Sequence, residues 1–155
     1  SRFMTQTRGT GVMNRTFHSY GPFKSGITGR VNGALISMET GSAVAFAIFN
    51  LQDRGEMFIG HNTEVYQGMI CGEHTRENDL EVNFLKGKKL TNMRASGSDE
   101  NVVLTPPRKM SLEEKMAYIN DDEVLEVTPK NLRLRKKYLD HHERKRMSKK
   151  NSQDI

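Results

Sequence analysis

The chain has 155 residues, a net charge of +5 at pH 7 and 35% hydrophobic residues, which indicates one domain, or two very small ones, with a modest core and poorly packed ends. It contains no apolar run of about 18 residues, so no transmembrane helix is expected, and its single cysteine, Cys71, excludes an internal disulfide. The charge is uneven: residues 130–150 hold ten Lys or Arg against two acids, and such a localised cationic patch favours an anionic polymer as partner.

The N-terminal segment alternates apolar and polar side chains imperfectly, which predicts an extended strand from about Gly11 to Ser19. Glycines and a proline between residues 21 and 29 then mark a connector. A lone strand cannot bury its apolar side chains, so it must pair with the main body, pair with a second copy of the chain, or stay disordered.

Short strands are predicted through the middle of the chain, at residues 31–38, 57–59, 65–73 and 80–84. Residues 43–49 are favoured as a further strand with Val44, Phe46 and Ile48 on one face, while the alanines leave a helix as the alternative. Closely spaced strands with internal glycines favour a strongly bent sheet or a small barrel.

The remaining helical signals lie in the C-terminal third. Ser111 and Glu114 form a capping box that predicts a helix to about Asn120, and Asp140 with Glu143 predicts a cap for a basic helix from His141 to about Lys150. Strands are expected at residues 102–104, 124–127 and 132–135, the last with a cationic outer face. Asp121–Glu123 is expected to be a solvated turn.

The predicted fold class is therefore a β-rich α+β domain, built as a bent sheet or partly closed small barrel with one capped helix and a basic C-terminal helix. The sequence has no phosphate-binding loop, no dinucleotide-binding fingerprint and no zinc-type cysteine cluster. We therefore expect no catalytic residues, no metal site and no cofactor in this chain. His61 and His74 are expected to be solvated or core-edge residues rather than metal ligands.

The most distinctive stretch runs from Leu85 to Gly97 and carries four cations without an acid. Clustered cations displace the counterions of a phosphate backbone, and short polar groups fix the register. The alternative is a solvated surface loop. The residues expected to contact such a phosphate backbone are Lys86, Lys88, Lys89, Asn92, Arg94, Arg133, Arg135, Lys136 and Lys137.

Several long motifs resemble the C-terminal domain of the BipA/TypA family of ribosome-associated translational GTPases. These motifs are Asn32–Gly41 (NGALISMETG), Asn50–Gly55 (NLQDRG), Glu64–Ile70 (EVYQGMI), Lys86–Gly97 (KGKKLTNMRASG), Leu104–Pro107 (LTPP) and Glu126–Pro129 (EVTP). Residues 1–20 resemble the last strand of the elongation-factor-G-like domain that precedes it. The resemblance thus divides the chain into that strand, a C-terminal domain at 21–140 and a basic helical or disordered tail at 141–155.

The resemblance implies a docking module for large-subunit RNA and the acceptor end of the A-site tRNA, acting in ribosome assembly and stress response. It implies a cytoplasmic, ribosome-associated protein with no membrane and no small-molecule substrate. GTP and magnesium would belong to the GTPase domain, which this chain lacks. The alternative function is a protein-interaction module whose acidic stretch at 113–126 binds a basic ribosomal protein. Pairing of two copies through residues 1–20 is a further possibility.

Overall fold

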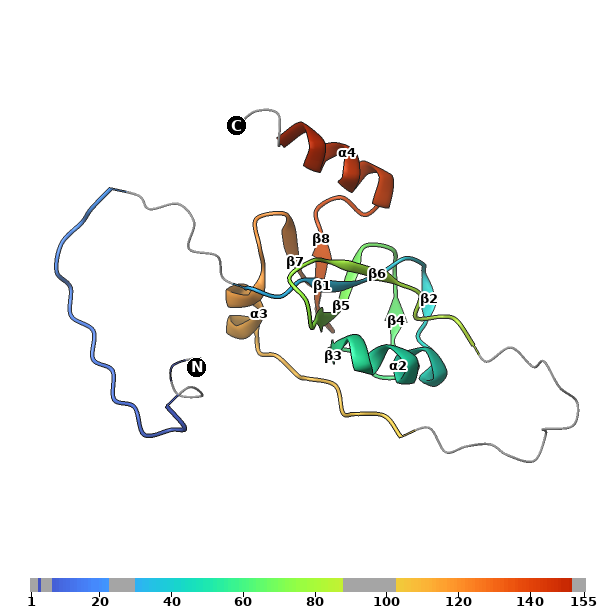
Figure 1. The fold of residues 1–155 in the computed structure, drawn as a ribbon, viewed down its shortest axis with the longest axis horizontal. Helices are drawn as coiled ribbons and strands as arrows, with labels where there is room; N and C mark the ends of the chain where they lie inside the picture. Colours follow the sequence, from blue (N-terminus) through green and yellow to red (C-terminus); the bar gives the residue numbers. More distant parts are fainter. Residues whose placement is uncertain (1–2, 4–6, 23–29, 88–102, 152–155) are drawn as a thin grey trace, which may run out of the picture.

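The computed structural model describes residues 3, 7–22, 30–87 and 103–151. Their body is a six-stranded sheet with three α-helices outside it (Figure 1). The strands are β1 (Ala34–Ser37), β3 (Gly55–Met57), β5 (Met69–His74), β6 (Leu80–Val82), β7 (Glu123–Val127) and β8 (Leu132–Lys136). The helices are α2 (Ala45–Leu51), α3 (Leu112–Tyr118) and α4 (His141–Asn151).

The sheet is open, with strand order β6-β1-β5-β8-β7. Every pairing is antiparallel except the parallel pair β1–β6. One edge of β5 is shared, because β8 pairs with Met69 and Ile70 while β3 pairs with residues 72–74. A small second sheet joins β2 (Gly41–Ser42) to β4 (Glu64–Val65). The β-rich α+β prediction is confirmed, and the sheet does not close into the barrel that was the alternative to a bent sheet.

Both faces of the sheet are covered, because alternate residues of the central strands enter two separate cores. Leu35 and Cys71 belong to a cluster on the α2 side, whereas Ile36 and Ile70 belong to a cluster on the α3 side with Tyr118. This two-sided burial explains why β1 consists entirely of buried residues instead of alternating. Burial also raises the pKa of the Cys71 thiol, which is therefore a small apolar core group.

The favoured strand at residues 43–49 is wrong, since α2 occupies Ala45–Leu51. The alternating pattern required Phe46 to be as buried as Ile48, but the chain instead buries Ala47 and Ile48, which are adjacent. The Ile48 amide donates to the Val44 carbonyl at 3.2 Å, as a helical turn requires. Alanine has the highest helix propensity, and here that propensity and the helical spacing of buried residues agree.

Two further predicted strands are absent from the part of the chain that the structure describes. Residues 10–22 form no strand, and Val12, Phe17 and Tyr20 are exposed. Val103 and Leu104 also form no strand, and the chain runs from there to Met110 without regular structure. The capping box of α3 is confirmed, because Ser111 Oγ accepts from the Glu114 amide at 3.2 Å and Glu114 accepts from the Ser111 amide at 2.8 Å.

Candidate functional site

The first end of the cation-rich stretch is fixed to the N-terminal end of α2. Phe84 is fully buried in the core, and its carbonyl accepts from the amide of Val44, the N-cap residue of α2, at 3.0 Å. The Asn83 side chain accepts from the Leu85 amide at 2.8 Å. Lys86, the next residue, is exposed. The chain therefore leaves a rigid platform immediately before its cations begin.

The segment from Leu85 to Leu104, called the excursion below, has its other end attached to the opposite end of α2. Gln52, the C-cap residue of α2, accepts from the Thr105 amide at 3.2 Å, and its side-chain amide donates to the Val103 carbonyl at 3.5 Å. Leu104 packs against the core cluster beside α2. A helix of seven residues is roughly 10 Å long, so both ends of the excursion are attached to one short helix. The predicted RNA contacts Lys88, Lys89, Asn92 and Arg94 lie outside the described residues.

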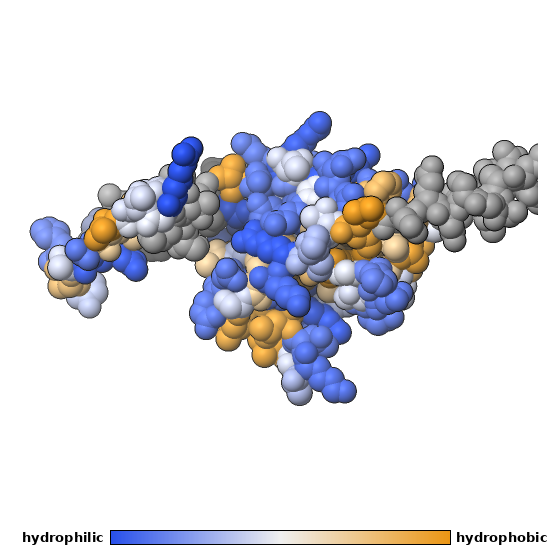
Figure 2. Space-filling model, turned by 90° about the horizontal axis from the view of Figure 1, so that it is seen from below, coloured by the Kyte–Doolittle hydropathy of each residue, from blue (hydrophilic) through white to orange (hydrophobic). Residues whose placement is uncertain are grey.

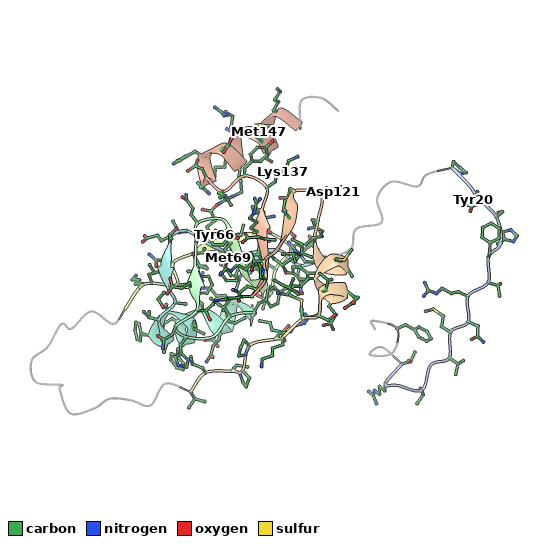
Figure 3. All side chains as sticks on the ribbon, turned by 180° about the vertical axis from the view of Figure 1, so that it is seen from behind. Tyr20, Tyr66, Met69, Asp121, Lys137 and Met147 are labelled. Atoms are coloured by element: carbon green, nitrogen blue, oxygen red, sulfur yellow. The ribbon has the colours of Figure 1, made fainter. Side chains whose placement is uncertain are left out.

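A second cationic group lies on the outer face of β8. Alternation places Arg133 and Arg135 on this face, each about one-third exposed, and both lie near Glu126, at 3.6 and 3.9 Å. Tyr66 donates to the same carboxylate at 2.7 Å, and burial together with this bond raises the pKa of the Tyr66 hydroxyl. Lys137, labelled in Figure 3, is exposed where the chain leaves β8 towards α4. One acid thus partly offsets two arginines, and the face stays cationic.

Lys136 does not belong to that face, which corrects the expectation that it contacts RNA. Its side chain is 3% exposed, and its ammonium lies 2.6 Å from Asp79, 2.8 Å from Asp122 and 2.9 Å from Glu123. Burial lowers the pKa of Lys136, but the hydrogen bonds that its ammonium donates to these carboxylates, together with their charge, outweigh burial and raise it. A phosphate would have to displace three internal partners to reach this cation.

The same cluster corrects part of the expectation of a solvated turn at Asp121–Glu123, because Asp121 and Asp122 lie in an exposed turn but Glu123 is buried. The Glu123 side chain is fully buried, and the Arg30 guanidinium binds it through two bonds of 2.7 and 2.9 Å. Arg30 also lies over the Tyr118 ring, 4.4 Å from its centroid. The signal that could have identified this cluster is the period of β8, since alternation from Leu134 places Lys136 on the inner face, directly opposite Glu123 in β7.

The acidic stretch at 113–126 is largely used inside the chain. Four of its six carboxylates bond to groups of the same molecule: Glu114, Asp122, Glu123 and Glu126. Fewer charges are thus left for a basic protein partner than the sequence suggests. Within the part of the chain that the structure describes, no group of three or more His, Cys, Asp or Glu side chains could hold a metal ion, and no helix is long and apolar enough to cross a membrane.

Comparison with known proteins gives one consistent family. The model of the TypA/BipA C-terminal domain matches residues 32–141. The large ribosomal subunit assembly factor BipA of Salmonella typhimurium is 56% identical over 150 residues, which are 96% of this chain and 25% of that protein. The proteins of the same name from Buchnera aphidicola subsp. Schizaphis graminum and Escherichia coli K12 are each 55% identical over the same shares.

This chain therefore spans about a quarter of the length of the curated relatives it matches. The family model that matches is that of the C-terminal domain and not that of a GTPase domain. Since the match covers well over half of the chain, the protein belongs to the TypA/BipA family, and residues 32–141 are its C-terminal domain.

Proposed function

We propose that this chain is an RNA-docking module of a large-subunit assembly factor. The cation-rich excursion after Phe84 contacts phosphates of large-subunit RNA and the acceptor end of the A-site tRNA. Arg133, Arg135 and Lys137 supply a second set of phosphate contacts. The module acts in the cytoplasm on the ribosome, as one part of a longer GTPase, and residues 1–20 end the domain that precedes it.

The observation that carries this proposal is the attachment of both ends of the excursion to α2. Val44 and Gln52 are the two cap residues of one helix. The Val44 amide donates to the Phe84 carbonyl at 3.0 Å, and the Gln52 side-chain oxygen accepts from the Thr105 amide at 3.2 Å. A platform of this kind orders the ends of a binding segment before the partner arrives, which reduces the entropy lost on binding. Ends that are attached in this way suit a segment that binds another molecule better than they suit a segment that only connects two elements of the fold.

The face of the molecule that is seen from below in Figure 2 also suits a polar partner. Seen from below, the surface is mostly hydrophilic, and its apolar side chains form small patches that hydrophilic residues interrupt (Figure 2). The relatives named above are described as assembly factors of the large ribosomal subunit, a particle composed largely of RNA. Both points favour phosphate recognition over a broad apolar interface.

The test is a loop variant in which Lys86, Lys88, Lys89 and Arg94 are all changed to Gln. Binding to purified large-subunit RNA is measured from 50 to 200 mM salt. If each cation neutralises one phosphate, the slope of log K against log salt falls in magnitude by about 3 to 4. An unchanged slope would contradict the proposal.

A matched control removes the same charge elsewhere. The body-control variant changes four exposed cations of the fold to Gln: Arg54, Arg76, Lys109 and Lys130. Both variants lower the net charge by four, so the proposal expects a clearly larger slope change in the loop variant. Equal changes would mean that only net charge matters and that the excursion has no special role.

A further inference from the structure

Helix α4 lies outside the sheet, at the top of Figure 1, and is placed by its own lead-in. Asp140 accepts from the Glu143 amide at 3.0 Å and so caps the helix. The preceding residue, Leu139, lies very close to Gly68. A Cβ added to Gly68 would lie only 2.8 Å from the Leu139 Cα, and Gly68 also has a φ of +84°. The start of α4 is therefore fixed against the turn between β4 and β5.

The inner side of α4 is attached to the sheet by charge. Arg144 donates to Glu81 of β6 at 2.5 Å and to the Leu139 carbonyl at 2.6 Å, and His141 contacts the same carboxylate. Burial raises the pKa of Glu81, but the bonds from Arg144 and His141 outweigh burial and lower it. Glu81 is therefore ionised at neutral pH and holds two residues of the helix, one turn apart.

The outer side of α4 collects cations. At 100° per residue, four exposed side chains fall within a sector about 140° wide that contains no acid. They are Lys145, Arg146, Lys149 and Lys150. Among the described residues none of the four has an acidic partner, and the pairs 145/149 and 146/150 place like charges one turn apart, which destabilises a helix. A polyanion along this sector would remove that repulsion.

Phosphates of RNA fit this sector better than a lipid surface does. A helix that lies on a membrane needs a broad apolar face, whereas Met147 is the one apolar residue among the ten whose side chains are described in α4, and it is half-buried (Figure 3). The charges repeat roughly every 6 Å along the axis, as suits a chain of phosphates. Lys149 and Lys150 also interact favourably with the negative end of the helix dipole. Lys145 and Arg146 lie too far from that end, so the dipole does not explain why they are cations.

We propose that α4 is a third RNA-docking element, in which Lys145, Arg146, Lys149 and Lys150 contact phosphates and Glu81 positions the helix through His141 and Arg144. This inference rests on the proposed function, since it assumes that RNA is the partner. It adds a binding surface at the end of β8, separate from the excursion attached to α2. Glu81 acts as a positioning residue and does not touch RNA.

The test is an α4 variant with all four cations changed to Gln, which has a helix propensity close to that of Lys and Arg. Circular dichroism confirms that the helix remains. In binding to large-subunit RNA, the slope of log K against log salt should fall in magnitude by about 3, while the body-control variant of equal charge keeps most of its slope. Equal slopes in the two variants would overturn the proposal.

Two comparisons separate this inference from the proposed function. If the loop variant loses RNA binding and the α4 variant does not, the inference fails and the proposed function stands; if neither variant differs from the body-control variant, both fail. Vesicles containing anionic lipid form the second comparison. An α4 variant that loses binding to vesicles but not to RNA would also overturn the inference.

Discussion

At the scale of single residues, Glu123 is the most consequential side chain of the fold. Its fully buried carboxylate binds Arg30 and Lys136, whose side chains are 4% and 3% exposed. Arg30 precedes β1, Glu123 begins β7 and Lys136 ends β8, so one carboxylate joins three distant parts of the chain. Buried charges persist only when opposite charges compensate them. In this cluster the buried cations and the carboxylate compensate one another, without help from water.

Glu123→Gln should therefore destabilise the protein by about 3–5 kcal/mol, because it leaves two buried cations with less opposing charge. Lys136→Met should cost less, since Glu123 would keep both bonds to Arg30 while Asp79 and Asp122 are partly exposed. Urea unfolding of both variants gives the comparison, with the exposed neighbour Asp121→Asn as control. A cost for Glu123→Gln no larger than that of the control would contradict this reading of the cluster.

At the scale of elements, α2 and α4 differ in what fixes them. Helix α2 is held by its buried residues Ala47 and Ile48, and its sequence fits either a short strand or a helix. Seven residues contain only two turns, so the periodic signal is too short to decide, and the core decides instead. Helix α4 has almost no apolar face, so its sequence predicts that it forms and where it is capped, but not the bonds to Glu81 that dock it.

Those bonds make the docking of α4 depend on pH. The folded pKa of Glu81 lies below its unfolded value, so its contribution is fully present above about pH 4.3 and is lost as the pH falls through the lower, folded pKa. Amide exchange of residues 144–148, expressed relative to the intrinsic exchange rate at each pH, should thus become faster at acid pH. In Glu81→Gln that exchange should already be fast at pH 7. Slow exchange of these amides in Glu81→Gln at pH 7 would show that something else holds the helix.

Glu81→Gln also tests positioning separately from charge. The substitution raises the net charge by one, so charge alone would strengthen RNA binding. Loss of a fixed α4 should weaken it instead, with the slope against salt unchanged because no cation is removed. The matched control is Glu77→Gln, an exposed acid with the same change of charge.

At the scale of the whole molecule, the sequence predicts the β-rich class, most strands and the capped helix α3, because these depend on local periodicity and caps. Closure of the sheet depends on which strands lie at its edges, and no local pattern specifies that β6 and β7 do. The candidate site divides in the same way. Runs of cations are visible in the sequence, and the period of β8 places Lys136 on its inner face. The carboxylates of Asp79 and Asp122 that bind Lys136 lie far from it in sequence and could not be assigned to it.

Cys71 can be used to measure the global stability of the folded domain. It lies in β5, which pairs with β1, β3 and β8, and the thiol is fully buried. Exposure of the thiol should require global unfolding, so the free energy from thiol-labelling rates should equal that from urea unfolding. The loop and α4 variants should leave it unchanged, because neither alters the core. A much lower value from labelling would indicate that β5 opens locally.

Because both ends of the excursion are attached to α2, the length of the excursion should have little effect on the stability of the domain. Once the two ends are fixed, doubling the length of chain between them costs only about 0.6 kcal/mol in closure entropy. The chain between Gly87 and Val103 can project at most half its extended contour, roughly 25 Å. Insertions and deletions there would change this upper limit almost without penalty while the scaffold stays the same. Under the proposed function, they would set how far the module extends towards RNA.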